Sequence, residues 1–227
     1  MTGEKEQTYL LIKDSIAFLY IDDSNGILRY KPAIDEDISN DKIVALAVIW
    51  NGRDIPLEMS RDQKEELFKW LNALPILSIA VVDNYCHGDL LELIMMCDIR
   101  LGGNNLFIRF PQDEPGFVFD FEERCQLLMG KEGKTGGYGS LLNSTMDSRE
   151  CYNLRLINQI TDMVDTSNEV QSYISSIMSN KGIYQIKAII KCFNNYKHLG
   201  LNSNRELLLE QESKQFCNLI VKEYLKK

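Results

Sequence analysis

Two acidic side chains stand three residues apart in a stretch that is otherwise almost wholly apolar. Asp89 and Glu92 both lie in NYCHGDLLELIMMCDIRLGG, residues 84–103. A helix over 88–96 would place both acids on one side near its N-terminal end, where the helix dipole favours negative charge. Two interpretations stay open: both acids line a narrow solvated edge, or a carboxyl lies in an apolar cleft, where burial tunes it for acid–base chemistry.

The turn before this helix carries further candidate groups. His87 has a side chain whose ordinary pKa near 6.5 suits a base, although a lone histidine in a turn is also commonly structural or solvated. Tyr85 lies beside it as a candidate substrate contact. Cys86 would act as a nucleophile only with a neighbouring base and a lowered pKa, and the sequence indicates neither. The two histidines and the six scattered cysteines, none in a CxxC pair, predict no metal site.

The order of the apolar runs predicts the architecture that must position these groups. IVALAVIW (43–50) and LSIAVV (77–82) are continuous aliphatic runs, typical of strands covered on both faces. Ser60 caps a helical pattern that Pro75 ends. The alternation of strands with helices predicts a parallel α/β core. The predicted elements are strands over 9–13, 15–21, 43–50, 77–82 and 98–101, the first two antiparallel, and helices over 61–74 and 88–96.

The second half of the chain has a different pattern, which is mostly helical. We therefore expect an α/β core over 1–147 and a helical C-terminal region over 148–227. The candidate helices of that region cover 148–154, 167–179, 183–199 and 204–225. The net charge of −8 and the pI of about 4.9 argue against a nucleic-acid or anionic-membrane binder. No apolar run approaches the ~18 residues that cross a membrane, and no export signal is recognisable, so we expect a cytoplasmic location.

The stretch LPILSIAVVDNYCHGDLLELIMMCDIRLGG, residues 74–103, resembles the signature of the crotonase superfamily, to which the enoyl-CoA hydratases and isomerases belong. Upstream, WNGRDIP (50–56) resembles the family's A-G-x-D-[LI] loop. Downstream, FIRFP (107–111) and MDSRECYNLRLINQI (146–160) resemble two further segments in the family's order. The signature itself is matched by Pro75, the strand over 77–82, Gly88, Glu92, Leu93 and Cys97-Asp98-Ile99-Arg100. The resemblance implies a crotonase-like α/β fold, with a parallel ββα-type core and a C-terminal region that assembles trimers.

The resemblance also implies an oxyanion hole for a thioester carbonyl. By position, the backbone N–H groups of Asn51 and Asp89 would donate to the developing oxyanion. Gly52, Gly88 and Tyr85 would line the substrate. The family's Gly-Gly-Gly is Gly88-Asp89-Leu90 in this chain. We therefore expect the Asp89 side chain to crowd the hole and to place negative charge beside the oxyanion.

A second departure concerns the carboxylates that hydratases use to move the proton of water. Glu92 aligns with one of the two, but the other position, after Pro111, is Gln112. A glutamine cannot exchange a proton, so hydration by two carboxylates is impaired. Asp113 would substitute if the loop is shifted, although Asp113 and its neighbour Glu114 are equally typical of a charged surface turn. Gly116 follows Pro115 like the family's P-G turn. Gln112 and Gly116 are both candidate substrate contacts.

These features predict a crotonase-fold enzyme that acts on an acyl thioester through a stabilised enolate. Glu92 would be the acid–base group, with His87 and Asp113 as further catalytic candidates. Dehydration or hydration, isomerisation and decarboxylation all stay open. Coenzyme A or the phosphopantetheine of an acyl-carrier protein would be part of the substrate, and no tightly bound cofactor is expected. The short chain end resembles the polyketide-pathway branch, and the family's assembly implies a homotrimer or a dimer of trimers.

Two alternatives compete with this interpretation. The altered glycine motif and the missing second acid favour a non-catalytic or accessory crotonase-fold subunit, which would bind an acyl group or a partner enzyme. A protease related by fold is the other alternative, but the two histidines do not yield a Ser/His/Asp set. Replacement of Glu92 discriminates the first alternative, because a binding subunit would keep its affinity without that carboxyl.

Overall fold

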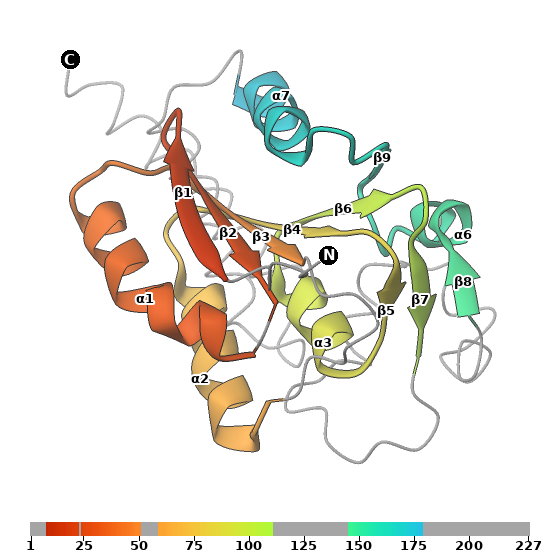
Figure 1. Ribbon diagram of the computed structural model, residues 1–227, viewed down its shortest axis with the longest axis horizontal. Helices are drawn as coiled ribbons and strands as arrows, with labels where there is room; N and C mark the ends of the chain where they lie inside the picture. The colour runs from red at the N-terminus through yellow and green to blue at the C-terminus, as the bar shows by residue number, and fades with distance from the viewer. Residues whose placement is uncertain (1–7, 23, 51–58, 111–144, 179–227) are drawn as a thin grey trace, which may run out of the picture. The chain divides into compact units, whose positions relative to one another are not determined.

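A computed structural model describes residues 8–22, 24–50, 59–110 and 145–178 of the chain (Figure 1). Its main sheet has the strand order β1-β2-β3-β4-β6-β9. β1 and β2 are antiparallel, and every later neighbour in the sheet is parallel. The strands are β1 (Tyr9–Lys13), β2 (Ile16–Ile21), β3 (Ala45–Trp50), β4 (Leu77–Val82), β6 (Ile99–Gly103) and β9 (Gln159–Thr161).

Three helices lie on one side of this sheet: α1 (Ser24–Ser39), α2 (Arg61–Ala73) and α3 (Gly88–Met96) (Figure 1). α1 packs against β2, and α3 packs against both α2 and β4. The predicted parallel strands over 43–50, 77–82 and 98–101 are confirmed as β3, β4 and β6. The predicted helix over 88–96 is confirmed as α3, which connects β4 to β6.

The central strands are buried on both faces. The register aligns Leu19, Val48 and Ala80 in one row, and these side chains share a hydrophobic core with the helices. The next row, Phe18 with Ala47 and Ile79, points to the opposite face and is also buried. Burial of alternate residues on both faces explains why these strands are continuous apolar runs rather than alternating ones.

Helix α1 was not predicted from the sequence. It forms the crossover from β2 to β3, and Ile27 and Ile34, two helical turns apart, are fully buried on it. Pro32 lies inside the helix. A proline in a helix interior removes a hydrogen-bond donor and usually breaks the helix, so the sequence pattern argued against one here.

A second sheet of three short strands leads the chain into α3. It has the order β5-β7-β8, with β5 (Tyr85–Cys86), β7 (Phe107–Arg109) and β8 (Thr145–Asp147). Cys86 pairs with Ile108, and both are fully buried. β5 ends two residues before Gly88, which begins α3 with a φ of 55°. Glycine adopts this left-handed backbone at little cost, so the short sheet and the glycine together fix where α3 begins.

The C-terminal part contains both confirmed and unpredicted elements. α6 (Ser148–Asn153) and α7 (Thr166–Met178) confirm the predicted helices over 148–154 and 167–179. β9 lies between them and was not predicted. The predicted helices over 183–199 and 204–225 lie outside the described residues, and the domain division after residue 147 stays a prediction. The chain forms two compact units, Met1–Val170 and Gln171–Lys227. In the described parts, no helix has the length and apolar character to span a bilayer.

Candidate functional site

The helix that carries the two acids is buried along almost its whole length. Every residue from Leu90 to Met96 is buried, and Glu92 is only 1% exposed. Asp89, in the first turn, keeps 15% of its side chain exposed. A solvated edge therefore does not describe Glu92, whose carboxyl lies inside the domain. The burial of Glu92 agrees with the second interpretation, whereas its use in acid–base chemistry stays a prediction.

The cation that accompanies both acids is Lys64 of α2. Its ammonium forms an ion pair with the Asp89 carboxylate and lies 3.6 Å from Oε2 of Glu92. The Lys64 side chain is only 13% exposed. Attraction between opposite charges is stronger in such a desolvated setting than at the surface. The site thus holds three charged groups at the α2–α3 contact, rather than two isolated acids.

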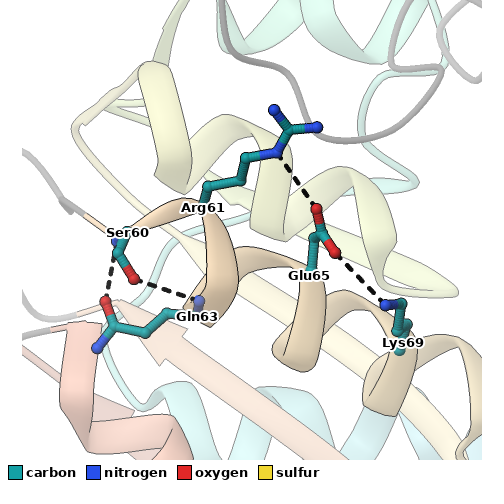
Figure 2. Close-up of polar contacts among 5 residues, drawn as sticks. All are labelled: Ser60, Arg61, Gln63, Glu65 and Lys69. Carbon is teal, nitrogen blue, oxygen red and sulfur yellow. Dashed lines mark hydrogen bonds and ion pairs between the residues drawn. The ribbon is translucent and has the colours of Figure 1, made fainter.

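Local sequence explains why Lys64 faces inward. α2 begins with a capping box, in which the Ser60 hydroxyl accepts from the Gln63 N–H at 3.3 Å and the Gln63 amide accepts from the Ser60 N–H at 2.9 Å (Figure 2). This box fixes the first turn. Lys64 then precedes the buried Leu67, Phe68 and Leu71 at spacings of three, four and seven. It occupies the apolar stripe of the helix, and that spacing was the available signal that sequence reasoning missed.

Asp89 joins two elements through its two oxygens. Oδ2 accepts a hydrogen bond of 2.7 Å from the Met59 backbone N–H, two residues before α2, and Oδ1 pairs with Lys64. From the sequence, its negative charge was expected to lie beside the oxyanion. In the structure that charge is balanced by an ammonium and a backbone donor. A carboxylate that is bonded in this way contributes much less repulsion than an isolated one.

The first turn of α3 presents backbone donors beside these charges. His87 is the N-cap residue, with extended backbone, and its side chain makes no capping hydrogen bond. The first N–H to reach a carbonyl of the turn is that of Leu91, which donates to the His87 oxygen at 3.4 Å. The N–H groups of Gly88, Asp89 and Leu90 precede it and have no acceptor within the helix. Helix starts of this kind favour a negatively charged ligand atom.

The two ring side chains of the turn lie against each other. The Tyr85 and His87 ring centroids are 5.0 Å apart, with an interplanar angle of 52°, and both side chains are half-buried. Cys86 between them is fully buried, and burial raises the pKa of its thiol well above the ordinary value. The thiolate form is therefore disfavoured, which argues against Cys86 as an activated nucleophile.

The Cys97-Asp98-Ile99-Arg100 part of the sequence signature has a structural role. The Asp98 carboxylate accepts from both the N–H and the hydroxyl of Ser78, at 3.0 and 2.7 Å, and so ties β6 to β4. The buried Arg100 guanidinium donates to the carbonyl oxygens of Leu156 and Cys97, at 2.7 and 2.9 Å. These bonds satisfy carbonyls that would otherwise be buried without donors. The motif thus fixes the C-terminal end of α3.

The predicted site residues divide between the described and the undescribed parts of the chain. Asn51, Gly52, Gln112, Asp113 and Gly116 lie outside the described residues. Those that the structure describes are Tyr85, His87, Gly88, Asp89 and Glu92, and all five come from β5, the turn after it and α3. Across the described ranges, no three His, Cys, Asp or Glu side chains gather as metal ligands would.

Comparison with known proteins identifies the fold. No protein-family model matches the chain, and no curated protein matches it. Solved structures do match. An enoyl-CoA hydratase/isomerase family protein from Silicibacter pomeroyi has 16% identity and a TM-score of 0.73, over 96% of this chain and 100% of that one. The enoyl-CoA hydratase from Thermoplasma volcanium has 13% identity and a TM-score of 0.74, over 96% and 92%.

A third match is to an enoyl-CoA hydratase from Geobacillus kaustophilus, with 18% identity and a TM-score of 0.71, over 96% of this chain and 89% of that one. Identities this low establish the fold and leave the activity open. The chain has the mixed α/β fold of enoyl-CoA hydratase/isomerase family structures. The crotonase-like fold predicted from the sequence is confirmed.

Proposed function

We propose that this chain is a crotonase-fold enzyme that acts on an acyl thioester through a stabilised enolate. The observation that carries the proposal is the buried Glu92 carboxyl on α3, one turn after a helix start whose cap makes no side-chain hydrogen bond. An acid–base group and backbone donors for an oxyanion are the two parts that enolate chemistry at a thioester needs. The fold that the chain shares with enoyl-CoA hydratase/isomerase structures supports the assignment.

In the proposed reaction, the Glu92 carboxyl moves the proton and the backbone N–H groups stabilise the enolate oxygen. Glu92 removes the proton from the carbon next to the thioester carbonyl, and the electron pair moves onto the carbonyl oxygen as an enolate. The Asp89 N–H, together with that of Asn51, donates to this oxygen. Glu92 can return its proton to another carbon, which completes an isomerisation, or to a β-hydroxyl, which leaves as water. A single carboxyl suffices for either outcome, so Gln112 at the second acid position is compatible with the proposal.

Decarboxylation is a further outcome that the same donors would support. Loss of carbon dioxide from a malonyl-type thioester also produces an enolate, and it needs no base in the bond-breaking step. His87 and Asp113 stay candidates for returning a proton in that case. Coenzyme A and a phosphopantetheinyl carrier protein are both candidate carriers, and the polyketide branch and a cytoplasmic location stay predictions.

The non-catalytic subunit is the second candidate. The observation that favours it is the Lys64 ammonium 3.6 Å from Oε2 of Glu92, because a carboxylate held by a cation in a buried setting is a weaker base. Such a subunit would bind an acyl group or a partner enzyme without turning a thioester over.

A substrate panel separates the two candidates. We would incubate the purified protein with 2-enoyl, 3-enoyl, 3-hydroxyacyl and malonyl-type thioesters, each on coenzyme A and on a carrier protein, and follow products by mass spectrometry. An enzyme should convert at least one member, and Glu92→Gln should lower the rate of a proton-transfer reaction by about 10²–10⁴-fold. Glu65→Gln is the matched control, because Glu65 lies on the exposed face of α2. No conversion, with acyl-thioester binding unchanged in Glu92→Gln, would support the binding subunit instead.

The assembly stays part of the proposal. A homotrimer, the arrangement expected from the family resemblance, predicts a particle of about 78 kDa, three times the 26.1 kDa chain. Light scattering coupled to size exclusion measures this mass directly. A peak at the mass of one chain that does not change with concentration would contradict the trimer.

A further inference from the structure

We propose that Lys64 and Asp89 are positioning residues, which together brace the start of α2 against the first turn of α3. The inference rests on the proposed function, because the turn that they hold is the one assigned to the oxyanion. It assigns to the Asp89 side chain a role other than crowding the site, and it adds Lys64 to the residues on which the reaction depends.

The Asp89 carboxylate bonds in two directions. Oδ2 accepts from the Met59 N–H at 2.7 Å, and Oδ1 pairs with the Lys64 ammonium. Met59 precedes α2, Lys64 is the fourth residue of α2, and Asp89 lies in the first turn of α3. One side chain therefore joins the first turn of α3 both to α2 and to the residue that lies two positions before α2. A charge-assisted bond at each oxygen restrains both the position and the rotation of the carboxylate.

The Lys64 ammonium also reaches Glu92. Lys64 Nζ lies 3.6 Å from Oε2 of a carboxyl that is 1% exposed. Glu92 follows Asp89 by three residues, so the two carboxyl groups share one side of α3. Lys64 thus separates two negative groups that would otherwise repel each other in a desolvated setting. Its removal would disturb the Glu92 side chain and the first turn together.

The burial of Lys64, Asp89 and Glu92 distinguishes this cluster from an ordinary surface ion pair. Lys64, Asp89 and Glu92 are 13%, 15% and 1% exposed, whereas Lys69 and Glu65 on the same helix α2 are 70% and 36% exposed. Surface pairs such as the latter hold nothing in place, because their side chains exchange freely with water. Positioning requires the restrained geometry that only the buried cluster has.

The experiment compares Lys64→Met, Lys64→Arg and the control Lys69→Met in the full-length protein. The first readout is hydrogen exchange of the Met59 backbone N–H in the protein alone. In Lys64→Met we expect exchange to accelerate about tenfold, because the Asp89 carboxylate loses the partner that holds it against Met59. Lys64→Arg should restore much of the protection, since a guanidinium also bonds carboxylates. Lys69→Met should exchange like the wild type.

The second readout is turnover of whichever thioester the panel identifies. Lys64→Met should lower kcat by about 10–100-fold with a smaller change in KM, because misplacement of donors and base by a fraction of an ångström acts on the transition state. Lys64→Arg should recover a large part of kcat. A loss confined to stability, with kcat unchanged in the folded protein, would overturn the positioning role.

The two readouts keep this inference separate from the proposed function. If no thioester is turned over, the proposed function fails. Met59 exchange still decides whether Lys64 and Asp89 hold the start of α2 against α3. If the wild type is active and Lys64→Met keeps both its Met59 protection and its kcat, the positioning role of Lys64 and Asp89 is wrong and the proposed function stands. Should Lys64→Met fail to fold, Asp89→Ala replaces it, with the same accelerated Met59 exchange expected and an unchanged rate contradicting the inference.

Discussion

Helix α2 carries two clusters of charge on different faces, and they differ in what they can do. The outer cluster is Arg61, Glu65 and Lys69, spaced by four residues, with contacts of 3.3 and 3.5 Å (Figure 2). The inner one is Lys64 with the two acids of α3. The outer cluster combines two cations with one acid, and the inner one combines one cation with two acids. Because the inner charges are withdrawn from water, each needs its partner, whereas water replaces any partner lost from the outer cluster.

Helix α3 holds two acids in an otherwise apolar sequence because of what packs against it. Asp89 and Glu92 are tolerated in α3 because a lysine from the neighbouring helix meets them. The same two acids on the outer face of α2 would need no such help. An acid among apolar residues of a helix therefore indicates a cation on a neighbouring element. In this chain that cation is Lys64 of α2, which packs against α3.

The largest effect is expected from removing the inner cation. Lys64→Met leaves two desolvated carboxylates without a counter-charge, which should lower the free energy of unfolding by about 3 kcal/mol. Chemical denaturation at neutral pH measures the loss. Addition of Glu92→Gln to Lys64→Met should restore part of it, because one of the uncompensated charges disappears. Additive losses in the double variant would mean that Lys64 and Glu92 do not interact.

A pH-dependent effect is expected from the buried thiol of Cys151 in α6. Burial is the main cause that raises the pKa of the Cys151 thiol from 9.0 to about 12, and the negative charges of the nearby Asp147 and Glu150 add to it. The folded state therefore keeps a proton that the unfolded state releases, and the free energy of unfolding should fall as pH rises from about 9 to about 12. Cys151→Ala should reduce that dependence. An equal slope in both proteins would contradict the shift.

The smallest effect is expected in the outer cluster. Glu65 accepts from Arg61 and Lys69, which lower the pKa of its carboxyl, but its side chain lies at the surface and is 36% exposed. Glu65→Gln should leave the denaturation midpoint at neutral pH unchanged within error, because water solvates both cations in its absence. A shift comparable with that of Lys64→Met would remove the distinction between the two faces of α2.

The sequence predicted the central part of the fold for a clear physical reason. Strands covered on both faces must be apolar throughout, so β3 and β4 stood out as continuous runs, and the Ser60 cap marked the start of α2. α1 was missed because Pro32 lies inside it. β9 was missed because a strand of three residues at a sheet edge has too few positions to establish a period.

The candidate site was predicted only in part. The spacing of Asp89 and Glu92 identified the helix and its two acids, since both lie within one short segment. Lys64 was not predicted, because its contacts with them depend on the packing of α2 against α3, and the two segments are about 25 residues apart. Its place on the apolar stripe of α2, in line with Leu67 and Leu71, was the only local sign.

The most direct test of the central claim is exchange of the proton next to a thioester carbonyl. A saturated acyl-CoA in deuterium oxide should acquire deuterium at that carbon when the protein is present, because enolate formation by Glu92 is common to isomerisation and dehydration. We predict exchange with the wild type and with Glu65→Gln, and loss of exchange with Glu92→Gln. Exchange that persists in Glu92→Gln at the wild-type rate would contradict the assignment of Glu92 as the acid–base group.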